Sequence, residues 1–94
     1  MIGYVTLGTN DLARSIAFYD DLLATLGAKR MMESETFVAW STSATAPAVS
    51  LIKPFDGNAA TVGNGTMVAL AVESPEQVKA VHAKALELGA ANEG

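Results

Sequence analysis

The pattern of apolar and polar residues in the first part of the chain predicts a strand followed by a helix. Residues 4–7 are short, β-branched and aromatic, which predicts a strand that ends at Gly8. Asn10 is expected to cap the following helix, with Asp11 in its first turn and Gly27 just past its end. Apolar residues recur between these points at the spacing of one buried helical stripe: Leu12, Ile16, Tyr19, Leu23 and Leu26.

Three more strands are predicted after this helix. Residues 28–33 and 36–40 read as two strands joined by a tight polar turn. A small, polar loop separates them from a strand at residues 49–53, which Pro54 stops. Residues 55–65 are rich in Gly and Asn and read as a flexible connection. The first half of the chain is therefore predicted to form a strand, a helix and three further strands, in that order.

The same order then begins again. Residues 66–72 form a nearly continuous apolar run, which predicts a strand buried on both faces. Ser74, Pro75 and Gln77 occupy the N-cap, N1 and N3 positions of a capping box, so a helix is expected from there. Its apolar stripe is Val78, Val81, Ala85 and Leu88, and Gly89 is expected to end it.

The two halves can be superposed as an internal repeat. A shift of 62 residues places Ile16 on Val78 and Gly27 on Gly89, and a shift of 63 places residues 4–7 on 67–70. Any two strand–helix pairs share some likeness, but the matched terminal glycines favour a true repeat. A complete second unit would need about 25–30 further residues, from a continuation past Gly94 or from another chain.

The helix that follows the first strand carries a family resemblance. Its start, Asp11 to Tyr19, reads D-L-A-R-S-I-A-F-Y and resembles vicinal-oxygen-chelate proteins, the superfamily of glyoxalases, bleomycin resistance proteins and some dioxygenases. The resemblance implies an α+β fold of paired βαβββ modules, with the second module apparently truncated after its helix. We expect one domain over residues 1–94: module one at about 1–55, a linker at about 56–64 and the start of module two at 65–94.

In that superfamily the paired modules curl around a cavity, and metalloenzyme members hold an ion on the first and last strands of each module. The resemblance places three of these positions on Tyr4, Leu51 and Met67, and the fourth past Gly94. A phenol, an alkyl group and a thioether suit a hard cation poorly. The adjacent residues are no better: Gly3, Val5, Ser50, Ile52, Thr66 and Val68. No metal or other cofactor is therefore predicted.

An apolar ligand is compatible with the same positions. Tyr4, Leu51 and Met67, together with Trp40, are expected to line an apolar cavity, although ordinary core packing would explain each of them equally well. Lys53 shares strand parity with Leu51 and would bring its ammonium group toward an anionic ligand, unless it is simply solvated at the strand end.

Composition narrows the partners and the chemistry. The net charge is −4 with no basic cluster, which argues against nucleic acid and anionic membranes, and no apolar stretch is long enough to span a bilayer. The absence of cysteine suggests a cytoplasmic location. His82, the Asp20–Asp21 pair and the Gly63-Asn64-Gly65 segment are interpreted as helix-surface, solvated and turn residues respectively.

Two functions are compatible with these features of the sequence. The first is a metal-independent small-molecule-binding protein with an apolar cavity, which is expected to be a homodimer. The alternative is a glyoxalase-like metal-dependent lyase, isomerase or dioxygenase, whose metal site is completed by residues beyond the chain or by a partner chain. A dimeric scaffold without a ligand is a third possibility, since this chain would expose unpaired strand edges.

Overall fold

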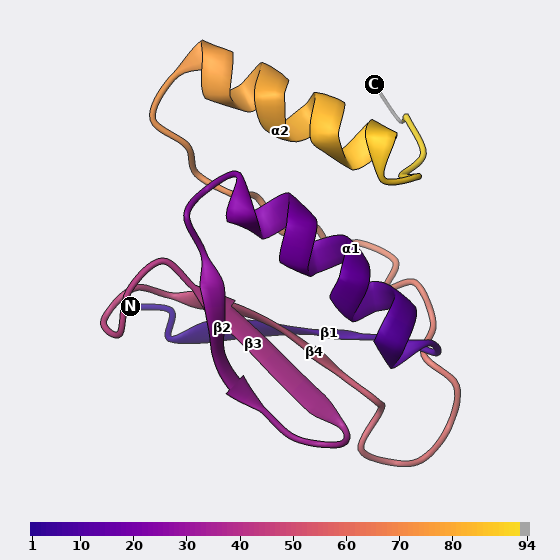
Figure 1. Cartoon of the computed structure of the whole chain (residues 1–94). Coiled ribbons are helices and arrows are strands. Elements are labelled where there is room, and N and C mark those ends of the chain that lie inside the picture. Colours follow the sequence, from indigo (N-terminus) through magenta and orange to yellow (C-terminus); the bar gives the residue numbers. More distant parts are fainter. Residues whose placement is uncertain (93–94) are drawn as a thin grey trace.

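A four-stranded mixed sheet lies beneath two helices in the computed structural model, which describes residues 1–92 (Figure 1). The elements are β1 (Tyr4–Gly8), α1 (Leu12–Ala24), β2 (Lys29–Glu33), β3 (Phe37–Ser41), β4 (Ala48–Ile52) and α2 (Pro75–Glu87). The strand order is β1-β4-β3-β2, with β1 parallel to β4 and the other neighbours antiparallel. The first five elements form one complete βαβββ module, so the predicted α+β class is confirmed.

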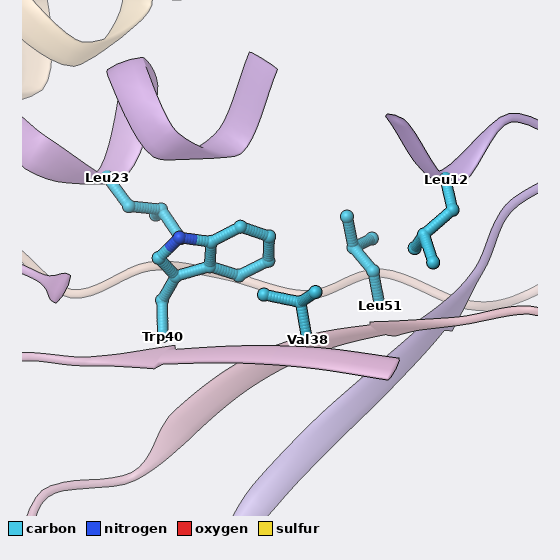
Figure 2. Packing of buried hydrophobic residues seen from close by; sticks show 5 residues of the cluster. All are labelled: Leu12, Leu23, Val38, Trp40 and Leu51. Atoms are coloured by element: carbon cyan, nitrogen blue, oxygen red, sulfur yellow. The ribbon is translucent and has the colours of Figure 1, made fainter. Parts of the chain in front are cut away.

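The core lies between α1 and one face of the sheet. Leu12 and Leu23 of α1 meet Val38, Trp40 and Leu51 of the strands, and each of these side chains is at most 8% exposed (Figure 2). Burying a side chain of this size contributes about 1.5–3 kcal/mol. The predicted helical stripe is therefore confirmed as the contact that folds the module.

Asp20 of α1 forms polar contacts with β2 and β3 at the edge of this core. Its Oδ1 accepts hydrogen bonds from Trp40 Nε1 at 2.8 Å and from Arg30 Nε at 2.9 Å, and its Oδ2 lies 2.5 Å from an Arg30 Nη2. One carboxylate thus joins α1 to β2 and β3. The hydrogen bond from Arg30 is the largest cause of the lowered pKa of Asp20, and the bond from Trp40 adds to it. The prediction of a solvated pair is wrong for Asp20, whereas Asp21 is exposed.

Both helices end in the same way, as the repeat predicts. Gly27 and Gly89 adopt φ of 78° and 104°, in the left-handed region that glycine enters without a Cβ clash. The amide of the residue after each glycine bonds back to a carbonyl five positions earlier, and the glycine amide bonds to a carbonyl three positions earlier, which defines a Schellman motif. The bonds are Ala28 N to Leu23 O and Gly27 N to Ala24 O, both 3.0 Å, and Ala90 N to Ala85 O at 2.9 Å and Gly89 N to Leu86 O at 3.1 Å.

The start of α1 differs from the prediction by one residue. Asp11, not Asn10, is the N-cap, and its Oδ1 accepts from Arg14 N at 3.1 Å. Asn10 is unavailable because its side-chain amide is bonded to the backbone of Ala60. Ser74 caps α2 as predicted, accepting from the backbone amide of Gln77.

Residues 66–72 do not form the predicted buried strand. They are extended but pair with no strand among residues 1–92, and Met67 is 87% exposed. The apolar run alone cannot bury itself, because both faces of a central strand need neighbours to cover them. For the same reason α2 has no fully buried residue, and Val78 at the start of its stripe is 56% exposed.

The helix ends allow a direct test of the repeat. Gly27→Ala or Gly89→Ala should each lower the free energy of unfolding by about 1–2 kcal/mol, because alanine is strained at positive φ. Gly3→Ala is the matched control, since no atom lies within 4 Å of the added methyl and the φ there is not positive. Equal denaturation midpoints for all three variants would contradict the assignment.

The contacts of Asp20 predict a pH dependence. Its folded pKa lies below the ordinary value of about 3.9, so the ionised carboxylate stabilises the fold above that pH and ceases to do so as the pH falls. The stability difference between the wild type and Asp20→Asn should be largest near neutral pH and shrink below about pH 4 in chemical denaturation. Asp21→Asn removes the same charge without these contacts and should have little effect; a pH-independent difference for Asp20→Asn would refute this role.

Candidate functional site

The two faces of the sheet carry different residues. Leu7, Leu51 and Val38 are register partners and face α1. Side chains alternate along a strand, so Thr6, Ser50 and Ala39 lie on the other side, which we call the open face. No helix or strand of the described residues 1–92 covers the open face (Figure 1).

The five residues predicted to bind a ligand do not share one cavity. Leu51 and Trp40 lie in the core beneath α1, each 2% exposed. Tyr4 is on the open face and 66% exposed, Lys53 is an exposed residue just after β4, and Met67 projects from the extended segment. Leu51 and Tyr4 therefore lie on opposite faces of the sheet, because Leu51 faces α1 and Tyr4 shares the parity of Thr6 and Ser50.

The residues that face the open side have side chains poorly suited to binding a metal ion. On β4 they are Ala48, Ser50 and Ile52. Ser50 is fully buried, donates through Oγ to Val5 O at 2.9 Å, and is 2.8 Å from Thr6 Oγ1, so its hydroxyl is occupied. Within residues 1–92 no group of three His, Asp or Glu side chains could hold an ion. Hydroxyl and alkyl groups bonded in this way do not fit a divalent cation.

A separate apolar hollow lies on the α1 side of the sheet. Its volume is about 360 Å³, and it is bounded by the C-terminal end of α1, the β1–β4 pair and residues 68–71 of the extended segment. The main apolar side chains around it are Val5, Leu23, Leu26, Trp40, Val49 and Leu70. Trp40 is therefore the one predicted ligand-binding residue that lines this hollow.

Among the residues that the structure describes, none with a charged side chain lines the hollow. Ser41 and Thr42 are the only side-chain hydroxyls among them. The Ser41 hydroxyl is already engaged with loop carbonyls, donating to Ser43 O at 2.8 Å and lying 3.1 Å from Ala46 O. An occupant would thus meet an apolar surface with very little fixed polarity.

Other residues singled out in the sequence have structural roles. His82 is exposed on α2. Gly63 to Gly65 form a turn, in which Thr66 N donates to Gly63 O at 3.3 Å and Gly65 has a φ of 85°. The sequence did not identify Leu26 or residues 68–71 as walls of the hollow, because their positions depend on how the extended segment lies against β1.

The comparison with solved structures decides the family. A glyoxalase/bleomycin resistance protein from Albidiferax ferrireducens T118 matches 95% of this chain and 72% of its own, with 36% sequence identity and a TM-score of 0.84. The chain belongs to the glyoxalase/bleomycin resistance family. A candidate glyoxalase from Bacillus halodurans has the same fold, with a TM-score of 0.69 and 21% identity over 95% of this chain and 69% of its own. No family profile and no curated protein matches the sequence significantly.

As a family member, this chain contains one complete βαβββ module, and within residues 1–92 no three His, Asp or Glu side chains gather as an ion site. Among the described residues, no helix is long and apolar enough to cross a membrane.

Metal binding can be tested directly. After equilibration with zinc, nickel or manganese and removal of the free ion, we expect the purified protein to retain substoichiometric metal, because the open face offers no suitable donor set. The measurement is elemental analysis of the protein fraction. A stoichiometric ion lost on Tyr4→Phe or Ser50→Ala would contradict this assignment.

Proposed function

We propose that this family member is a metal-independent small-molecule-binding protein. The observation that carries the proposal is the apolar hollow of about 360 Å³ beside Trp40. Its volume falls in the range of about 300–1,000 Å³ found for ligand pockets. Burial of apolar surface in such a hollow supplies the free energy of binding without a metal or a catalytic group.

The walls also indicate the class of ligand. A charged molecule would lose its hydration without meeting an opposite charge, at a cost of several kcal/mol. An uncharged, largely apolar molecule of modest size is therefore the expected ligand. The anionic ligand expected for Lys53 is not part of this proposal, because Lys53 does not line the hollow.

Trp40 provides the test, because it is the only tryptophan in the chain. The neutral probe N-phenyl-1-naphthylamine should quench Trp40 emission and brighten its own, saturating at one probe per chain. Ala69→Phe, which places a ring in the wall of the hollow, should weaken binding about tenfold or more, since one blocked apolar contact of this size is worth about 1.5–3 kcal/mol. Ala59→Phe in the preceding exposed loop is the matched control.

Either of two results would contradict the proposal: no energy transfer from Trp40 to the probe, or equal affinities for Ala69→Phe and Ala59→Phe.

We also propose that the protein is a homodimer. β1 is an edge strand, and residues 57–72 beside it contain no charged residue although the chain carries a net charge of −4. Val62 and Met67 are 98% and 87% exposed there. Two copies can approach through this region without juxtaposing like charges, and its exposed apolar side chains favour association.

Sedimentation equilibrium tests the dimer. The wild type should sediment as a dimer, and Val62→Lys with Met67→Lys should dissociate it, because two like-charged ammonium groups would be brought together at the interface. The control is Lys79→Glu, an exposed charge change on α2. A monomeric wild type would remove the proposal.

A further inference from the structure

Residues 61–72, here called the strap, form the outer wall of the hollow. They contain no helix or strand and no charged residue. In Figure 1 the strap passes behind α1, from the region where β1 ends to the start of α2. It therefore spans the free side of the β1 edge.

The strap runs antiparallel to β1. Its residues 66–68 share a hollow of about 540 Å³ with Leu7 and Gly8 at the end of β1. Residues 68–71 share the apolar hollow with Ile2 and Val5 at the beginning of β1. Val68 and Leu70 are 37% and 39% exposed, whereas Met67 between the two hollows is 87% exposed. Residues 68–71 together therefore wall the apolar hollow, and Met67 lies outside it.

The strap is anchored at its first end by Asn10. Asn10 Nδ2 donates to Ala60 O at 2.9 Å, and Ala60 N donates to Asn10 Oδ1 at 2.6 Å, so one side-chain amide pairs with both polar groups of a single residue. Gly8 permits this close approach, since a Cβ there would lie 3.2 Å from the Ala60 Cβ. The other end is fixed where Ser74 caps α2.

Between the anchors, no backbone hydrogen bond ties the strap to the sheet within residues 1–92. The register of the strap against β1 therefore depends on its ends. A slip of one residue along β1 would bring Met67 into the wall of the hollow and move Ala71 out of it. The shape of the outer wall would change with it.

We propose that Asn10 is a positioning residue for the hollow: by holding Ala60 it sets the register of the strap along β1 and so the shape of the ligand-binding wall. The inference rests on the proposed function, since it assigns Asn10 a part in binding through the wall and not through contact with the ligand.

Cysteine pairs measure the register without a ligand, because the chain has no cysteine of its own. Ile2→Cys with Leu70→Cys joins residues of one hollow, and Ile2→Cys with Val62→Cys joins residues of two different hollows. The first pair should form its disulfide faster under mild oxidation. Adding Asn10→Ala should reduce the ratio of the two rates about fivefold or more, as expected for the loss of two hydrogen bonds.

Matched variants distinguish a loss of strap positioning from a general loss of stability. Asn58→Ala, an exposed asparagine of the preceding loop, should leave the rate ratio unchanged. Asn10→Asp keeps an acceptor for Ala60 N but loses the donor to Ala60 O, so an intermediate ratio is expected. If Asn10→Ala fails to fold, Asn10→Asp decides the question. A rate ratio that does not change in a folded Asn10 variant overturns the inference.

Probe binding distinguishes this inference from the proposed function. Without engineered cysteines, Asn10→Ala should weaken binding of N-phenyl-1-naphthylamine about fivefold, and Asn58→Ala should not. A changed rate ratio with no probe binding to the wild type would uphold Asn10 as the residue that positions the strap and overturn the proposed function. Probe binding to the wild type with an unchanged rate ratio would uphold the proposed function and overturn the role of Asn10.

Discussion

Packing of α1 against one face of the sheet is the constraint on which the rest of the structure depends. Trp40, Val38 and Leu51 are buried only because Leu12 and Leu23 lie over them. Strand alternation then requires that the neighbours of these residues face away, and small residues such as Ala39 and Ser50 occupy that side. The same packing therefore creates the core and leaves small side chains on the open face.

Polar contacts around this core fix the positions of the helices and of the loop that follows β4. Asp20 holds the side of α1 to β2 and β3. Glycine-terminated caps fix where α1 and α2 stop, and Asn10 ties a distant loop to the β1–α1 junction. Because these contacts place the end of α1 and the start of the strap, they determine the walls of the apolar hollow beside Trp40. Recognition in this account depends on the shape of the hollow and the apolar character of its walls.

The sequence predicted every element of the first module to within one or two residues, because the helical stripe and the strand runs are local patterns. It also predicted both glycine caps. Periodicity shows which residues of one strand share a face but not which face meets α1, so Leu51 and Tyr4 were expected around one cavity although they lie on opposite faces of the sheet. The prediction of Asn10 as the N-cap is wrong, because its side-chain amide bonds to the backbone of Ala60, 50 positions away, and Asp11 caps α1. Contacts of that range, and the strap that lacks strand partners, cannot be read from local pattern.

The most direct test of the central claim, that an uncharged apolar ligand occupies the hollow between α1, the sheet and the strap, is a titration of ¹⁵N-labelled protein with N-phenyl-1-naphthylamine followed by two-dimensional NMR. The account predicts that the shifts concentrate on the Trp40 indole, on Leu26 and on residues 68–71. Shifts centred on Tyr4, Thr6 and Ser50 of the open face would contradict it.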